Sequence, residues 1–301
     1  MAGLTEPDGS APLISVVVTA YNRREYLKSA VDSVLCQTLP RDRYEVVVSK
    51  NFEFDLDSEW SDLGVKLVFF DRPGLGARVA DALRYCKGEV VCFLDDDDWW
   101  APRKLEHVVR VWQRNPGCVY YHHGLYFTTT TGRVYGRSRR KTHFNASGVC
   151  IAKRILLENI EYLKENPYPI DLFYWVIANL SGGKIILDNH PLSYYRSNTP
   201  KTGKRQEALA GGQSKSEIFK RMIEDSGNHA FAKCFYRQGQ MGAVLQRAYR
   251  GEQIRMADLR SYLHGMASNL DLATIEGLLV VLTGMVAPNL IQWLYNKRNN
   301  F

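Results

Sequence analysis

Short, mostly apolar runs alternate with segments of helical periodicity over the first hundred residues. The runs lie at 13–19, 44–49, 65–69 and 89–94. Continuous β-branched runs of this length are typical of strands that are buried on both faces, as in parallel sheets. Between them, 24–36 and 77–86 carry apolar residues at helical spacing. This alternation predicts an α/β layer with a mostly parallel sheet.

The second half of the chain has a different pattern. Residues 118–127 predict an aromatic strand, with a return strand that begins at Arg133, and 145–157 predict a loop followed by a helix. An apolar helix is expected over 171–180, and two further strands are expected over 184–187 and 192–196. Residues 197–214 are rich in Gly, Lys, Thr and Pro and predict a mobile loop.

These patterns divide the chain into three parts. We expect a flexible leader over 1–12, an α/β domain over 13–214 and a helical region over 215–301. Length alone allows one large domain or two small ones.

Composition and charge narrow the class of protein. The chain has 301 residues, of which 45% are hydrophobic, and a net charge of +7. A basic chain suits a phosphate-bearing substrate or an anionic membrane surface. Nucleic acid is not an expected partner, because the basic clusters lack interleaved aromatic residues. The six cysteines show no C-x-x-C spacing, and the first residues do not resemble a signal peptide, which predicts buried thiols in a cytoplasmic protein.

An apolar segment near the C-terminus allows two interpretations. Residues 275–295 are about as long as a bilayer span, but Glu276, Pro288 and Asn289 interrupt the segment. Aromatic residues followed by Lys297 and Arg298 are typical of an anchor on the cytoplasmic side of a membrane. A helix that closes the core would have a similar composition. The sequence leaves both interpretations open.

Four consecutive aspartates, Asp95 to Asp98, follow directly after the predicted strand at 89–94. Carboxylates that emerge together from a buried strand repel one another, and a divalent cation relieves this repulsion. Mg²⁺ and Mn²⁺ prefer oxygen ligands and link carboxylates to substrate phosphates. Ligands bind at the carboxyl ends of parallel strands, so this run and the loop TAYNR after the first strand should share one site.

Three segments resemble family 2 glycosyltransferases of the GT-A fold and occur in that family's order. They are ISVVVTAYNRREYLKSAVDSVLCQT, GLGARVADALRYCKGEVVCFLDDDDWWAP and PIDLFYWVIANLSGGKIILDNHPLSYYR. The resemblance covers roughly residues 13–196. It implies a Rossmann-like GT-A catalytic domain over 13–214 with a mixed, mostly parallel sheet flanked by helices, followed here by a helical C-terminal extension. Within that domain, the resemblance implies that about 13–117 bind the nucleotide sugar and about 118–214 bind the acceptor.

The resemblance also implies roles for individual positions. Asp97 would be the direct metal ligand, with Asp95 beside it facing the ribose or sugar, and the ion would be Mn²⁺ or Mg²⁺. Asp171 would be the catalytic base. The donor would be bound by Thr19, Tyr21, Asn22, Asn51, Arg78, Asp95 and Asp96. Lys201, Lys204 and Arg205 would add positive charge near the diphosphate or acceptor once their loop closes. Without the resemblance, Asp171 is equally a helix-terminal aspartate favoured by the dipole.

The chain departs from the family at three places. An Asp-Asp pair commonly follows the second strand, whereas Lys50 and Asn51 stand here. Asn51, Asp55 and Asp57 are the alternatives for recognising the base. Ile170 stands where the family usually has a Glu just before the catalytic base, here Asp171. Asn198 stands where the family often has a His.

These observations favour a metal-dependent inverting glycosyltransferase that uses a nucleoside-diphosphate sugar, such as GDP-mannose or a UDP-hexose. The acceptor would be a glycan or a lipid-linked molecule, with the enzyme in the cytoplasm or on the cytoplasmic face of the membrane. A nucleotidyltransferase is one alternative, but it predicts a glycine-rich phosphate loop that TAYNRREY lacks. A catalytically silent protein that binds nucleotide sugars is the other, because Lys50 and Asn51 alter the expected base site.

Overall fold

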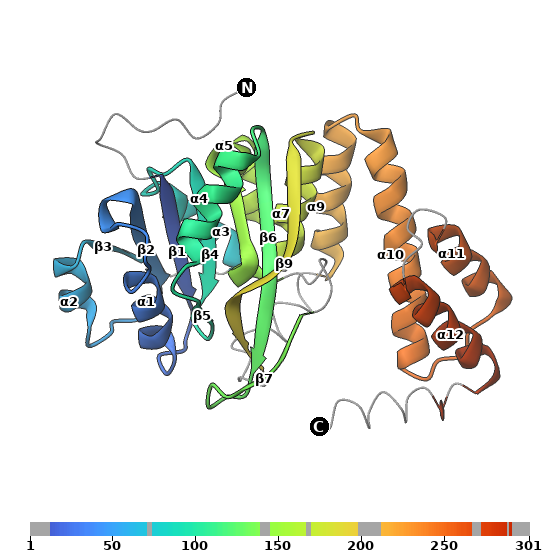
Figure 1. The fold of residues 1–301 in the computed structure, drawn as a ribbon. Helices are drawn as coiled ribbons and strands as arrows, with labels where there is room; N and C mark the ends of the chain where they lie inside the picture. Colours follow the sequence, from blue (N-terminus) through green and yellow to red (C-terminus); the bar gives the residue numbers. More distant parts are fainter. Residues whose placement is uncertain are drawn as a thin grey trace. The chain divides into compact units, whose positions relative to one another are not determined.

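The computed structural model describes residues 13–70, 74–138, 145–166, 170–197, 212–266, 272–287 and 289–290. It divides into two compact units, Met1–Met222 and Ile223–Phe301. The first unit holds the sheet and the second is helical (Figure 1).

The first unit is built on a nine-stranded sheet. Its strand order is β3-β2-β1-β4-β8-β6-β9-β5, and β7 pairs with β6. The strands are β1 (Ile14–Ala20), β2 (Tyr44–Lys50), β3 (Val65–Phe69), β4 (Val90–Asp95), β5 (Trp99–Trp100), β6 (Cys118–Thr128), β7 (Val134–Arg137), β8 (Val149–Ala152) and β9 (Lys184–Arg196). Strands β1 to β4 are parallel, which confirms the mostly parallel sheet expected from the apolar runs.

Helices cover both faces of this sheet (Figure 1). One face packs α1 (Leu27–Leu35) and α4 (Lys104–Arg114) against alternate residues of the central strands, including Val16 and Leu94. On the other face lie α3 (Leu75–Leu83) and α7 (Ile170–Leu180), where the ring of Tyr174 stacks on Phe93 at 4.3 Å between centroids. Burial on both faces explains why these strands read as continuous apolar runs.

Shorter helices complete the first unit. They are α2 (Asp57–Asp62), α5 (Lys153–Glu158), α6 (Ile160–Glu165) and the 3₁₀ turns η1 (Arg41–Arg43) and η2 (Ala146–Gly148). The helices that follow are α9 (Gly212–Asp225), α10 (His229–Tyr249), α11 (Met256–Met266) and α12 (Leu272–Val286).

The second half of the sheet differs from the expected elements in two respects. The expected strands at 184–187 and 192–196 are one strand, β9, with irregular pairing where Gly124 lies beside Pro191. The expected loop and helix over 145–157 contain a short strand, β8, which runs antiparallel between β4 and β6. Four apolar residues before a helix carry too little periodicity to mark a strand.

Cys92 and Cys150 lie directly opposite each other on β4 and β8, with their sulfur atoms 3.0 Å apart. Both are buried free thiols, as are Cys86 and Cys118, whereas Cys36 is free and exposed.

The helical unit has its own small core around Val244, Ala248, Tyr262 and Val281. Helix α12 covers residues 275–286 of the apolar segment 275–295, and residues 288 and 291–295 of that segment lie outside the described residues. One side of α12 is open to solvent, because Leu279, Leu282 and Val286 are 63%, 41% and 86% exposed. Among the described residues, no helix has both the length and the hydropathy that crossing a bilayer requires.

Candidate active site

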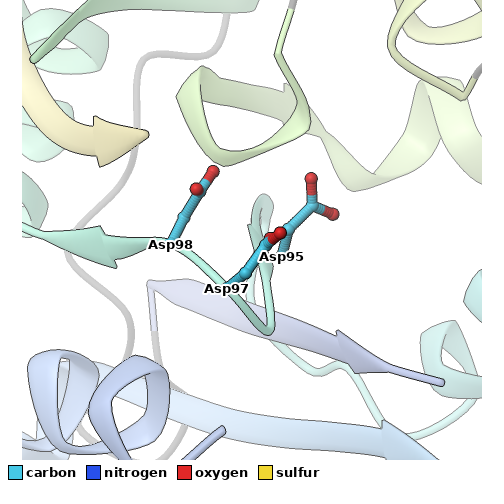
Figure 2. Close-up of side chains that lie close together, drawn as sticks. All are labelled: Asp95, Asp97 and Asp98. Atoms are coloured by element: carbon cyan, nitrogen blue, oxygen red, sulfur yellow. The ribbon is translucent and has the colours of Figure 1, made fainter. Parts of the chain in front are cut away.

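The acidic run forms the turn between the end of β4 and β5, at the carboxyl edge of the parallel strands. Asp95, Asp97 and Asp98 each offer a carboxylate oxygen, and these oxygens lie within 4.8 Å of one another (Figure 2). Asp95 and Asp97 are half-buried, whereas Asp98 is buried. Three converging carboxylates in a partly dry site suit a hard divalent cation.

Asp98 is held from three directions. Its Oδ2 accepts a 2.6 Å hydrogen bond from the Ser147 hydroxyl and a 3.5 Å contact from the side-chain amide of Asn145. Its Oδ1 accepts a 3.0 Å bond from the backbone N–H of Arg196. Burial raises the pKa of Asp98 well above its usual range, with a further rise from the charges of Asp97 and Asp95. Because both of its oxygens already have donors, Asp98 is suited to orient the turn.

Ser147 connects the turn to β8. Its hydroxyl also accepts a 3.1 Å bond from the backbone N–H of Asp95. Its carbonyl oxygen accepts bonds from Trp100 Nε1, Lys104 Nζ and the Ser193 hydroxyl, at 3.1, 2.8 and 2.8 Å. Ser147 therefore links Asp95 and Asp98, at the two ends of the acidic turn, to Trp100, Lys104 and Ser193.

Arg23, in the loop after β1, binds the other two members of the run. Its guanidinium pairs with Asp96, and its Nη1 lies 2.8 Å from Asp97 Oδ2. Asp96 is buried, and burial raises its pKa to about 6 against the opposing effect of Arg23. The resemblance placed Asp96 among the donor-binding residues, whereas its carboxylate is directed to Arg23.

The expected donor-binding residues of β1 and its loop lie beside this turn. Thr19 is the register partner of Asp95, on neighbouring strands. Asn22 adopts a left-handed backbone with φ of 55°, and its N–H donates to Asn51 Oδ1 at 3.0 Å. The amide of Asn51 in turn donates to Asn22 Oδ1 at 2.7 Å. This reciprocal pair joins the carboxyl ends of β1 and β2.

Arg78 and Tyr21 also meet. The Arg78 guanidinium lies 4.0 Å from the centroid of the Tyr21 ring and 5.3 Å from that of Phe70. Its depth depends on Gly76, whose N–H donates to the Asn166 carbonyl at 3.0 Å. A Cβ at Gly76 would lie 1.9 Å from the carbonyl oxygen of Leu163, so α3 approaches the end of α6 backbone to backbone.

Lys50 is buried away from the expected base site. Its ammonium donates to Asp57 Oδ2 and to the Phe52 carbonyl, each at 2.6 Å, and lies 4.1 Å from the centroid of the Phe69 ring. Asp57 also accepts the Phe54 N–H at 3.0 Å. Lys50 and Asp57 therefore pair with each other, and Asn51 is the strand-end residue that faces the loop of β1.

Asp171 is the second residue of α7 and is half-buried. Its Oδ1 accepts the Leu172 N–H at 2.9 Å. Tyr174 lies one turn later on α7. Burial raises the pKa of its phenol well above 10, and the negative charges of Asp95 and Asp171 raise it further. Asp171 and the acidic turn therefore lie within electrostatic range of one side chain.

The sequence also singles out residues in the segment after β9. Lys201, Lys204, Arg205 and Asn198 lie outside the described residues. Conversely, sequence reasoning gave no role to Arg23, Ser147 or Arg196. Arg23 and Arg196 stand inside the segments that carry the family resemblance, which was an available signal, whereas Ser147 in NASG carried none.

Comparison with known proteins agrees with this geometry. Residues 15–155 match the family model described as glycosyl transferase family 2. A UDP-Glc:α-D-GlcNAc-diphosphoundecaprenol β-1,3-glucosyltransferase of Escherichia coli is 30% identical over 132 residues, which are 42% of this chain and 50% of that protein. An uncharacterized glycosyltransferase of Nostoc is 34% identical over 118 residues, 36% of each chain. In the first three curated relatives, the match spans between 17% and 36% of their length.

Solved structures share the fold across most of the chain. Staphylococcus aureus TarS in complex with UDP has a TM-score of 0.53 at 15% identity, covering 95% of this chain and 91% of that one. The mannosyltransferase PcManGT of Pyrobaculum calidifontis, in complex with GDP-Man and Mn²⁺, has a TM-score of 0.52 at 18% identity, covering 94% and 87%. Together with the sheet and the acidic turn, these matches show the GT-A fold, and residues 15–155 are similar to glycosyl transferase family 2.

Proposed function

We propose that the chain is a metal-dependent, inverting glycosyltransferase. It transfers a hexose from a nucleoside-diphosphate sugar, GDP-mannose or a UDP-hexose, to a hydroxyl of a glycan or a lipid-linked acceptor. The observation that carries this proposal is the convergence of Asp95, Asp97 and Asp98 at the carboxyl edge of the sheet, beside Thr19 and Tyr21. Known relatives support the substrate class: one acts on a diphosphoundecaprenol acceptor, and structural neighbours bind UDP-GlcNAc or GDP-Man.

The acidic turn fits a divalent cation, Mn²⁺ or Mg²⁺. Asp97 and Asp95 would hold the ion, since both are half-buried, and Asp98 would orient the turn. A bound cation supplies charge that stabilises the departing diphosphate. The solved structure of the neighbour PcManGT is a complex with GDP-Man and Mn²⁺. Arg23 holds one carboxylate oxygen of Asp97, which limits the directions that this side chain can take.

The protein's own groups would position the donor. Tyr21 and Asn51 would contact the base and ribose, and the hydrogen bonds between Asn22 and Asn51 would hold their loops in place. Arg78 brings a buried positive charge toward the sugar or diphosphate. Oriented donors and charges of this kind stabilise the negative charge that develops on a leaving group.

Asp171 would act as the general base. It would accept the proton of the acceptor hydroxyl while that oxygen forms a bond to the anomeric carbon. The bond from the anomeric carbon to the diphosphate oxygen breaks on the opposite face, which inverts the configuration. A positioned carboxylate contributes roughly 10²- to 10⁴-fold to such a step.

The direct test is a turnover assay over a panel of UDP-, GDP- and TDP-sugars with Mn²⁺ or Mg²⁺, following release of the nucleoside diphosphate. We expect metal-dependent release with one class of donor, stimulated by a lipid-linked or glycan acceptor. No release with any donor, alongside metal-dependent nucleotide binding by calorimetry, would instead indicate a silent binding protein.

A further inference from the structure

Arg196, the last residue of β9, is buried between two aromatic rings. Its guanidinium carbon lies 4.3 Å from the centroid of Tyr26 and 4.7 Å from that of Trp99. Tyr26 immediately precedes α1, whereas Trp99 follows the acidic turn. A planar guanidinium stacks on aromatic faces in this way, which an ammonium group cannot reproduce.

The polar atoms of Arg196 bind the acidic turn and a neighbouring loop. Its backbone N–H donates to Asp98 Oδ1, and its Nε donates to the carbonyl oxygen of Asp97, both at 3.0 Å. Its Nη1 donates to the carbonyl oxygen of Thr130, in the loop between β6 and β7. One residue therefore fixes the Asp97–Asp98 peptide and ties it to the hairpin of β6 and β7.

The stack continues beyond Trp99. Trp99 stacks on Tyr194 at 5.1 Å with 6° between the rings, and Tyr194 stacks on Tyr126 at 4.9 Å with 20°. The column therefore runs through Tyr126, Tyr194, Trp99, Arg196 and Tyr26. Side chains held on both faces lose little further freedom when a ligand binds, which is the condition for a preorganised site.

We propose that Arg196 is the positioning residue for cation binding, a role that rests on the proposed metal-dependent function. It fixes the Asp97–Asp98 peptide so that the carboxylates of Asp95, Asp97 and Asp98 converge. A positioning role and a purely electrostatic role of Arg196 predict opposite changes in Mn²⁺ affinity when its positive charge is removed. A positive charge beside a cation site opposes the cation, so removing it would tighten Mn²⁺ binding if charge alone mattered. Loss of positioning would weaken Mn²⁺ binding instead.

The test is Mn²⁺ binding to the full chain, measured by titration calorimetry without nucleotide, for wild type, Arg196→Ala and Arg196→Lys. We expect Mn²⁺ affinity to fall roughly 10-fold or more in Arg196→Ala, the scale seen when groups that orient metal ligands are lost. Arg196→Lys keeps the charge but loses the planar fork and should also bind Mn²⁺ more weakly. Arg137→Ala, an exposed arginine on β7, is the matched control and should bind as wild type does. Wild-type or tighter Mn²⁺ binding in either Arg196 variant would overturn the proposal.

Amide hydrogen exchange of the peptide that spans 95–99 gives a second, metal-free readout. The Asp98 N–H donates to the Asp95 carbonyl at 3.1 Å within the turn, so this bond should open more often in Arg196→Ala. Faster exchange confined to this peptide would support the positioning role, and unchanged exchange would contradict it. If wild type binds no Mn²⁺ either alone or together with UDP or GDP, the proposed function fails, while the exchange measurement still decides the role of Arg196.

Discussion

The hydroxyl of Ser147 donates a 2.6 Å hydrogen bond to Asp98 and accepts one of 3.1 Å from the backbone N–H of Asp95. Both contacts are shielded from solvent, because Ser147 is fully buried. The acidic turn is therefore supported from below by a neutral side chain, while Arg23 and Arg196 bind it from other segments.

Ser147→Ala should lower both stability and Mn²⁺ affinity. The change leaves a buried carboxylate oxygen and a backbone N–H without this partner, at a cost of about 1–3 kcal/mol in the free energy of unfolding. Chemical denaturation measures this cost. Ser193→Ala is the matched control, because the carbonyl of Ser147 keeps its donors from Trp100 and Lys104 when the Ser193 hydroxyl is removed. An equal loss in the free energy of unfolding in the two variants would show that the hydroxyl of Ser147 does not stabilise the acidic turn specifically.

Asp97→Ala should remove the metal dependence of nucleotide binding. The half-buried carboxylate is the proposed direct ligand, and its loss leaves too few oxygens to hold the ion. Calorimetric titration of UDP and GDP with and without Mn²⁺ gives the result. Asp62→Ala, an exposed carboxylate on α2, should retain the full Mn²⁺ effect. The same Mn²⁺-dependent affinity in Asp97→Ala as in wild type would rule out this ligand.

The part of the site that is built on the parallel strands was predictable from local sequence. The contacts that support the acidic turn from other segments were not. The apolar runs predicted β1 to β4, and topology then brought the loop of Tyr21 and the acidic run to one edge. Contacts such as Asp98 with Ser147 join residues 49 positions apart, and no local pattern reports them. Lys50 is a related case: it was expected just after the second strand, whereas it is the last residue of β2, and its partner Asp57 became visible only in three dimensions.

Asp171→Asn should leave donor affinity unchanged and lower kcat by about 10²-fold or more, the scale of a lost general base. The amide has nearly the same shape, so the bond from the Leu172 N–H to the side-chain oxygen can persist. Steady-state turnover with the preferred donor, together with calorimetry of donor binding, separates the two effects. Glu161→Gln, on the exposed surface of α6, serves as control. Turnover near the wild-type rate would show that Asp171 only serves the start of its helix.

Lys104→Met should change how stability depends on pH. Lys104 is fully buried against Trp100, and burial lowers its pKa to about 8. In the unfolded chain its pKa is near 10.5. As pH rises, the folded state therefore releases this proton at a lower pH than the unfolded chain does. The contribution of Lys104 to stability therefore rises between about pH 8 and pH 10.5 and is lost as pH falls through 8.

The variant should accordingly gain most relative to wild type near pH 7, and the difference in free energy of unfolding should shrink as pH rises toward 10. Urea denaturation at several pH values measures it, and Lys28→Met on the exposed side of α1 controls for loss of charge. A difference that does not vary with pH would contradict a buried ammonium with a lowered pKa.

The open side of α12 predicts interfacial membrane binding. Replacing Leu279, Leu282 and Val286 together with Gln should reduce co-sedimentation with vesicles that contain phosphatidylglycerol, because the helix loses the apolar side chains that would enter the interface. Leu263→Gln, an exposed leucine on α11, should sediment as wild type does. Equal sedimentation of the triple variant and wild type would place any membrane contact elsewhere.

The close approach at Gly76 restricts how this protein can evolve at the start of α3. Two backbone carbonyls occupy the space where any side chain at this position would begin, and neither can rotate away as a side chain would. Mutation of Gly76 therefore cannot adjust the depth of Arg78 in small steps, because any Cβ at this position would meet backbone. Changes in donor preference would have to arise in the surrounding loops, leaving the start of α3 as a fixed reference point across descendants of this sequence.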